Sequence, residues 1–140
     1  MRKILYAVAV MLVCTVLMPI KGFCAERNDN VNLLAALCIA EAGNQDDTGK
    51  KLVIDVVLNR MVSDEFPDTI EDVIYAPNAF SCVHDGGLEK AKSMYTEHEI
   101  KLVMDELCDE VDYDVVYFRT DRYADYGTPK LKHGDHYFSK

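Results

Sequence analysis

The segment from Thr48 to about Val62 most constrains what this chain can fold into. It predicts a helix that is apolar over most of its circumference, because hydrophobic residues fall on nearly every side. These residues are Leu52, Val53, Ile54, Val56, Val57, Leu58 and Met61. Such a helix needs neighbours on most sides to keep its surface from water. We therefore expect it to be the buried centre of a small domain.

Two polar side chains interrupt this apolar helix. Asp55 and Asn59 lie one turn apart on it. Polar groups at buried positions require hydrogen-bond partners. We interpret both residues as caps or anchors for a neighbouring loop. Asn59 also lies one turn from a plausible groove, so it is a candidate substrate contact as well.

A shorter helix, from about Val31 to Ala42, precedes this segment and ends at a carboxylate. Leu34, Leu37 and Cys38 form an apolar stripe, and the same spacing continues to Glu41. Burial and the negative end of the helix dipole both disfavour an ionised carboxylate, so both would raise its pKa. A carboxyl group that keeps its proton is suited to general acid catalysis. The alternative is a surface glutamate whose side chain reaches water.

The rest of the chain predicts an α+β domain with three main helices and a short antiparallel hairpin. Ile70 to Tyr75 predicts a short helix, and Phe80 to Val83 a brief extended segment. Glu97 to about Asp109 predicts a long helix with an apolar inner stripe, and we expect its acidic residues to form a solvated face.

The hairpin is predicted near the C-terminus. Val115 to Arg119 has strand composition, Thr120 to Leu131 is a turn-rich connection, and His136 to Phe138 can return as the partner strand. The aromatic residues of this region have two interpretations. They cover the core of the helices, or they form a platform on which sugar rings stack.

The N-terminus has the layout of a secretory signal peptide. Arg2 and Lys3 precede an apolar run from Ile4 to Ile20, which leads into a charged segment. We assign residues 1–25 to the signal and 26–140 to one catalytic domain. Retention of the apolar run as an N-terminal membrane anchor is the alternative. Export to the extracellular space is expected in either case.

Charge excludes one class of partner. The signal holds three of the 15 basic residues and none of the 24 acidic ones, so residues 26–140 carry 12 basic and 24 acidic residues. A domain this acidic is a poor partner for nucleic acid. Any affinity for an anionic cell wall would have to come from a shaped groove rather than from charge.

The cysteines do not indicate a metal site or a disulfide framework. Outside the signal there are Cys38, Cys82 and Cys108, an odd number, with no Cys-x-x-Cys pair and no histidine spaced to complete a zinc site. We expect buried free thiols, with one disulfide as the alternative. No essential metal and no cofactor are expected.

The residues favour acid catalysis over nucleophilic or metal-assisted chemistry. No Ser/His/Asp order, Cys/His dyad or paired-histidine motif stands out. Cleavage of a glycosidic bond needs a proton for the leaving oxygen, which a neutral Glu41 would supply. Most glycosidases also use a second carboxylate. Asp85, Glu65 and Asp121 are conceivable, but the sequence places none of them opposite Glu41.

A series of short motifs resembles the SleB/CwlJ-type cell-wall hydrolases, which include spore cortex-lytic enzymes. The resemblance covers nearly all of residues 26–140, and the order and spacing of the motifs carry it. The motifs are Leu37 to Asn44, Gly49, Val53 to Val57, Leu58-Asn59-Arg60, Phe66 to Ile70, Val73-Ile74-Tyr75, Phe80 to Val83, Asp85-Gly86 and His136-Tyr137-Phe138.

The resemblance implies a lysozyme-like α+β domain that cleaves the glycan strand of peptidoglycan, with Glu41 as the catalytic acid. The family is regarded, at least in part, as lytic transglycosylases. In that reaction the C6 hydroxyl of muramic acid is the internal nucleophile, so one group serves as acid and then base. Phe80 and Ser81 correspond to the loop that faces the groove, and Tyr117 and Tyr137 to aromatic strand positions. Asp85 completes this set of expected substrate contacts.

Two positions depart from the family pattern. Gln45 stands where members often have a second glutamate, and Ala79 where they often have a glutamine. These differences leave Glu41 in place and concern the preference of the binding groove. The expected function is an exported peptidoglycan-cleaving enzyme. The alternatives are a non-catalytic peptidoglycan-binding or assembly protein that keeps the groove, and a hydrolase for another polysaccharide such as chitin.

Overall fold

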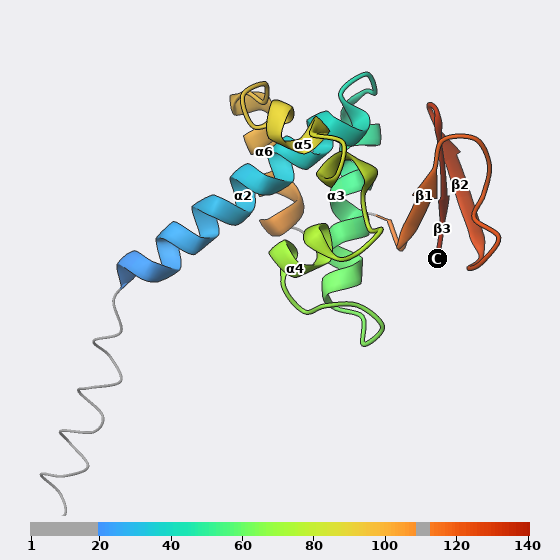
Figure 1. The fold of residues 1–140 in the computed structure, drawn as a ribbon, viewed down its shortest axis with the longest axis horizontal. Coiled ribbons are helices and arrows are strands. Elements are labelled where there is room, and N and C mark those ends of the chain that lie inside the picture. The colour runs from blue at the N-terminus through green and yellow to red at the C-terminus, as the bar shows by residue number, and fades with distance from the viewer. Residues whose placement is uncertain (1–19, 109–112) are drawn as a thin grey trace, which may run out of the picture.

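The computed structural model describes residues 20–108 and 113–140. Its helices are α2 (Ile20–Ala42), α3 (Asp47–Met61), α4 (Ile70–Tyr75), α5 (Gly87–Ala91) and α6 (Glu97–Cys108), with a 3₁₀ turn η1 (Ser81–Val83). Its strands are β1 (Tyr117–Arg119), β2 (Pro129–His133) and β3 (His136–Ser139). Figure 1 shows the helices grouped around α2 and α3, with the sheet beside α3. The predicted α+β class is confirmed.

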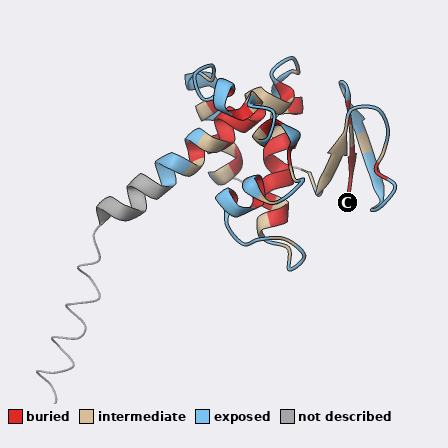
Figure 2. Cartoon of the chain, in the orientation of Figure 1, coloured by how far each residue is buried: buried red, intermediate tan, exposed pale blue. Residues whose placement is uncertain are grey.

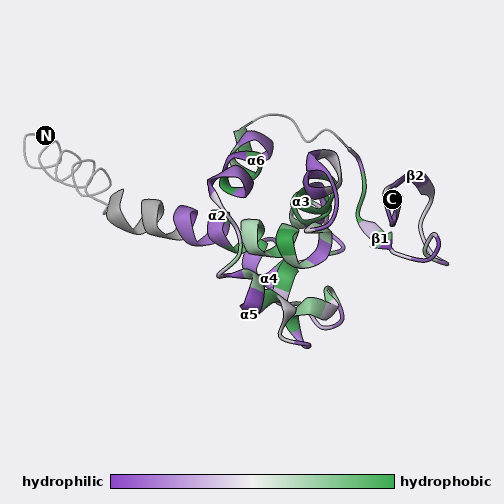
Figure 3. Cartoon of the chain, turned by 90° about the horizontal axis from the view of Figure 1, so that it is seen from above, coloured by the Kyte–Doolittle hydropathy of each residue, from purple (hydrophilic) through white to green (hydrophobic). Residues whose placement is uncertain are grey.

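Helix α3 is the buried centre of the domain, as its composition predicts. Every residue from Leu52 to Val57 has no exposed surface, and α3 is the most continuously buried helix in Figure 2. It packs against α2, α4 and α6, whose apolar sides turn towards the core in Figure 3. The helix begins one residue before the predicted cap, because the Asp46 side chain accepts a hydrogen bond from Gly49 N at 2.9 Å.

The two polar residues of α3 anchor the segment that leads into the sheet. Asn59 Nδ2 donates to the carbonyl oxygens of Tyr113 and Val115 at 2.7 and 2.9 Å. Asp55 Oδ2 accepts a hydrogen bond from Tyr113 N at 3.2 Å. The interpretation of both residues as loop anchors is therefore confirmed.

The acidic residues of α6 do not all form a solvated face, and that prediction is wrong for two of them. Glu99 and Glu106 are 4% and 3% exposed. Glu99 pairs with Lys50 of α3 at 2.8 Å, and Glu106 pairs with Lys51 at 2.6 Å. Burial disfavours the charge of Glu99, but hydrogen bonds from Lys50 and Thr96 outweigh it and lower its pKa to about 2.

The sheet has one more strand than the predicted hairpin. Strands β1 and β3 pair antiparallel, with Phe118 opposite Phe138, as expected. The strand order is β1-β3-β2, so β2 occupies part of the segment predicted as a turn-rich connection. Strand β2 lies at an edge and exposes alternate lysines, so it lacks the apolar run that marks a strand. The expected extended segment at Phe80–Val83 is also corrected: only Phe80 is extended, and η1 follows it.

The predictions of an N-terminal signal and of buried free thiols are only partly tested or confirmed by the structure. Residues 1–19 of the predicted signal lie outside the described residues, and α2 starts at Ile20 rather than near Val31. Within the described residues, no helix combines the length and hydropathy that crossing a membrane requires. Cys38 and Cys82 are free and buried, as predicted, whereas Cys108 is free and exposed.

Candidate active site

Glu41 lies in the last turn of α2, at the predicted end of the apolar stripe. The residue is half-buried. Its Oε1 atom is buried and has no hydrogen-bond partner among the described residues. An unpaired buried carboxylate oxygen is costly, so it calls for an explanation in terms of a ligand or a reaction.

Cys82 and His136 are the side chains that interact with Glu41. Burial raises the pKa of the Cys82 thiol, and the Glu41 carboxylate, within hydrogen-bonding reach, raises it further. Burial lowers the pKa of His136, while the negative charge of Glu41 opposes that shift. Cys82 comes from η1 and His136 from the start of β3, so three separate segments meet at this carboxylate.

His136 has the second unpaired atom at this site. It is 3% exposed, and its Nδ1 atom has no hydrogen-bond partner among the described residues. Its ring lies 4.9 Å from that of Phe118 and 5.8 Å from that of Phe138. The sequence predicts His136 only as a strand residue. The signal for a buried His136 is the alternation of a strand: His136 and Phe138 are two residues apart and therefore lie on the same face.

A clasp between two loops brings His136 to Glu41. Gln45 Nε2 donates to Asp135 Oδ2 at 3.1 Å, and His133 Nε2 lies 2.7 Å from Asp46 Oδ1. The loop after α2 is thereby joined to the β2–β3 turn. Gly134 lies in this turn at a φ of 52°, and a Cβ atom there would meet the Gln45 side chain. Gln45 therefore fastens the sheet to the helices.

The loop that carries Cys82 also lines a cavity. Its volume is about 400 Å³, and it is lined by Asn78, Ser81, His84 and Asp85. Two of the predicted substrate contacts, Ser81 and Asp85, line this cavity. They lie in the same loop as Cys82, which interacts with Glu41. Asp85 Oδ1 accepts a hydrogen bond from Gly87 N at 2.8 Å, which gives it a role in the turn.

Phe80 and Tyr137 lie apart from this cavity. Phe80 is 3% exposed and packs against Phe118, with ring centroids 6.2 Å apart. Tyr137 stands between buried His136 and Phe138, so the alternation of a strand turns it to the opposite face of the sheet. There its ring contacts Tyr123 at 5.2 Å.

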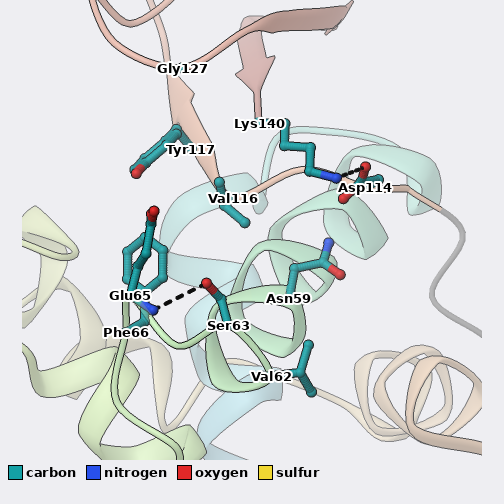
Figure 4. A pocket seen from close by; sticks show the side chains of 10 residues that line it. All are labelled: Asn59, Val62, Ser63, Glu65, Phe66, Asp114, Val116, Tyr117, Gly127 and Lys140. Atoms are coloured by element: carbon teal, nitrogen blue, oxygen red, sulfur yellow. Dashed lines mark hydrogen bonds and ion pairs between the residues drawn. The ribbon is translucent and has the colours of Figure 1, made fainter.

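Asn59 and Tyr117 line a different cavity, which we call the Phe66–Tyr117 pocket (Figure 4). Its volume is about 570 Å³, and its lining residues are Asn59, Val62, Ser63, Glu65, Phe66, Asp114, Val116, Tyr117, Gly127 and Lys140. It lies at the C-terminal end of α3, whereas Glu41 is near the N-terminal end. The helix has 15 residues, so the two places are roughly 20 Å apart along it.

The other carboxylates considered at the sequence level do not join Glu41. Glu65 lies in the Phe66–Tyr117 pocket. Asp121 is exposed and lies near Arg119 and Arg122, at 3.9 and 3.4 Å. Among the described residues there is also no group of three or more His, Cys, Asp or Glu side chains that could hold a metal ion.

Comparison with known proteins identifies the family. A family model described as cell wall hydrolase matches residues 44–139. The chain belongs to the cell wall hydrolase family. The matched range begins three residues after Glu41. The remaining segments of the site, η1 and β3, lie inside the matched range.

Curated relatives and solved structures agree with this membership. The spore cortex-lytic enzyme of Bacillus subtilis is 30% identical over 117 residues, which cover 79% of this chain and 37% of that protein. The spore cortex-lytic enzyme of Oceanobacillus iheyensis is 40% identical over 58 residues, covering 41% of this chain and 21% of that protein. The chain thus spans less than half the length of these cell wall hydrolase relatives.

Two solved catalytic domains share the fold. The catalytic domain of the Bacillus cereus SleB protein superposes with a TM-score of 0.69 at 27% identity, covering 81% of this chain and 91% of that one. The catalytic domain of the germination-specific lytic transglycosylase SleB from Bacillus anthracis gives 0.67 at 26% identity, covering 79% and 93%. The resemblance noted from the sequence is confirmed.

Proposed function

We propose that this chain cleaves the glycan strand of peptidoglycan as a lytic transglycosylase, with Glu41 as its only acid and base. The observation that carries the proposal is the Glu41 carboxylate, half-buried at the end of α2 with an unpaired oxygen. The loop that carries Cys82, which interacts with Glu41, lines a cavity, and the chain is a member of the cell wall hydrolase family. Buried unpaired carboxylates of this kind are suited to proton transfer.

The reaction uses one carboxyl group twice. Protonated Glu41 gives its proton to the oxygen that links muramic acid to the next sugar, and the bond from C1 to that oxygen breaks. The carboxylate then accepts the proton of the C6 hydroxyl of the same muramic acid, whose oxygen bonds to C1. The products are a 1,6-anhydro end and a free hydroxyl on the departing sugar. This route needs no second carboxylate opposite Glu41.

The comparisons support this chemistry at the level of the family. The similar Bacillus anthracis domain is described as a lytic transglycosylase, and the similar Bacillus subtilis protein as a spore cortex-lytic enzyme. The clasp formed by Gln45 and Asp46 supports a fixed site, because it holds the β2–β3 turn against the loop that follows Glu41.

Mass spectrometry of digested, purified walls tests the proposal. The wild type should release fragments with 1,6-anhydro ends, and the Glu41→Gln variant should release about 10³-fold fewer while keeping its thermal unfolding midpoint. New reducing ends in place of anhydro ends would indicate that the enzyme is a hydrolase and not a transglycosylase. Wall binding without new ends of either kind would favour the non-catalytic binding protein. Parallel digestion of chitin oligomers separates a general polysaccharide hydrolase from both.

We also infer that the chain is exported, because a wall-cleaving enzyme must reach the wall and residues 1–25 have the layout of a signal peptide. Sequencing the N-terminus of the protein recovered from a secreting host checks this inference. A new N-terminus near Glu26 is expected for a cleaved signal. An intact Met1 in the membrane fraction would indicate a retained anchor.

A further inference from the structure

The Phe66–Tyr117 pocket has two chemically different walls. Figure 4 shows Phe66, Glu65 and Tyr117 on one side, and the ion pair of Lys140 with Asp114 on the other. The ring centroids of Phe66 and Tyr117 are 6.0 Å apart. A cavity with an aromatic wall facing polar groups is a common form of small-ligand site.

The aromatic wall is held rigidly from behind. Arg60 is 8% exposed, and its guanidinium carbon lies 5.2 Å from the Phe66 centroid and 5.8 Å from that of Tyr117. Arg60 Nε donates to Val116 O at 2.7 Å, which fixes the guanidinium against both rings. Tyr126 stacks edge-on against Tyr117 at 4.8 Å. A ligand therefore meets a preformed surface and orders few side chains on binding.

The polar groups around the pocket limit what can bind. The Glu65 carboxylate is exposed and forms no ion pair or side-chain hydrogen bond with any described residue. Lys140 is paired with Asp114, so the pocket offers no uncompensated positive charge for a phosphate. A neutral ligand that is rich in hydroxyl and amide groups matches both the free carboxylate acceptor and the rings.

We propose that the Phe66–Tyr117 pocket binds a sugar residue of the glycan strand, several residues away from the bond that is cut at Glu41. The inference rests on the proposed function and adds a second contact with the same substrate. A sugar ring presents a C–H face to Tyr117 and Phe66, and its hydroxyl and acetamido groups to Glu65. Because the pocket is roughly 20 Å from Glu41 along α3, only long strands reach both places.

Strand-length dependence provides the test. Wild type, Tyr117→Ala and Tyr75→Ala are compared on long purified glycan strands and on short oligosaccharides cut from them. Tyr75 is a matched control, because it is an exposed tyrosine on α4 that lines a separate cavity. We expect Tyr117→Ala to lower the ratio of kcat/KM on long over short substrates about tenfold, or about 1.4 kcal/mol, through KM. Tyr75→Ala should leave the ratio unchanged.

A binding experiment separates this inference from the proposed chemistry. Glu41→Gln and the double variant Glu41→Gln with Tyr117→Ala are titrated with long strands, and binding is measured without cleavage. Weaker binding by the double variant supports the pocket even if the wild type releases no anhydro ends. Equal binding by both, or an equal loss with Tyr75→Ala, overturns it.

Glu65→Gln guards against loss of folding in the tyrosine variant. Because Glu65 is exposed and its carboxylate has no partner among the described residues, this change should leave the unfolding midpoint as it is. We expect it to weaken long-strand binding by about fivefold, because the amide oxygen accepts a weaker hydrogen bond than the charged carboxylate. The proposal is contradicted if a folded Tyr117→Ala variant binds long strands as the wild type does. Adding Glu65→Gln to that variant should then also leave long-strand binding unchanged.

Discussion

The polar groups around the two ends of α3 are paired to different degrees, and the unpaired Ser139 Oγ opposite Tyr117 is the exception at the far end. Near its start, Glu41 Oε1 and His136 Nδ1 are buried without hydrogen-bond partners among the described residues. Near its end, Asn59 makes two hydrogen bonds, Arg60 is held by a carbonyl and rings, and Lys140 is paired. Buried polar groups without partners destabilise the folded state but are available to react. Paired polar groups hold the surrounding side chains in one arrangement. The first end is suited to chemistry and the second to binding.

The largest expected effect separates the two ends through a matched pair of substitutions. Glu41→Gln should reduce the release of wall fragments by about 10³-fold, because general acid catalysis typically raises a reaction rate by about 10²- to 10⁴-fold. Glu65→Gln, the same change at the other end, should reduce it by about fivefold at most. Assays of fragment release per mole of folded protein measure both. If both variants lose fragment release to a similar extent, the two ends of α3 do not differ in function as proposed.

Arg60 tests whether the binding end depends on a preformed wall. Its guanidinium lies near the rings of Phe66, Phe80 and Tyr117. Arg60→Ala should lower the free energy of unfolding by about 2–3 kcal/mol, because packing, cation–π contacts and the bond to Val116 O are lost together. Arg60→Lys keeps the charge but loses the planar stacking, so an intermediate loss is expected.

Urea unfolding curves give these free energies. The exposed lysine Lys101 provides a control, since Lys101→Ala removes a long cation from the surface of α6 and should change little. If Arg60→Ala proves as stable as the wild type, the rings do not rely on the guanidinium.

The comparison also shows what a sequence can predict about such a domain. The ends of α2 and α4, at Ala42 and Tyr75, follow from local stripes and stop signals. The half-buried position of Glu41 follows for the same reason, because a carboxylate that continues an apolar stripe is visible within one helix. Asp55 and Asn59 are found because an apolar helix cannot leave them without partners.

Features that depend on distant segments are not found in this way. Strand β2 has exposed lysines, and only its pairing with β3 makes it a strand. Glu99 and Glu106 have the spacing of a solvated face, yet Lys50 and Lys51 of α3 lie opposite them. His136 interacts with Glu41 from β3, whose turn is hydrogen-bonded through Asp135 to Gln45 in the loop after α2. None of these partners is adjacent in sequence.

His136 gives the reactive end a dependence on pH. Its folded-state pKa lies below the usual 6.5, chiefly because burial disfavours the imidazolium. The unfolded chain therefore binds the proton more readily, so the stabilising contribution is complete above about pH 6.5 and is lost as the pH falls towards the folded pKa. The groups that interact with it are Glu41, Asp135 and His133. Thermal unfolding midpoints from about pH 8 to about pH 5 should fall more in the wild type than in His136→Asn.

His84 provides the control for that measurement, because it is an exposed histidine in the loop cavity. His84→Asn should show the same pH dependence of the midpoint as the wild type. If His136→Asn also retains the wild-type dependence, His136 is not the group responsible.

The smallest effect on activity concerns the thiols, and it tests how tightly the reactive end is enclosed. Burial, with a smaller contribution from the charge of Glu99, raises the pKa of Cys38 to about 12. Burial and Glu41 raise that of Cys82. Since the thiolate is the reactive form, both should react with iodoacetamide only when the structure opens locally, whereas exposed Cys108 should react rapidly.

Mass spectrometry of digested protein gives the labelling rate of each cysteine peptide. Modified Cys108 should leave wall cleavage unchanged, since it ends α6 outside both regions. If Cys82 is labelled as fast as Cys108, solvent reaches the neighbour of Glu41 freely. The contrast between an enclosed reactive end and an open binding end would then be lost, and the unpaired oxygen of Glu41 would be explained by water instead of by a reaction.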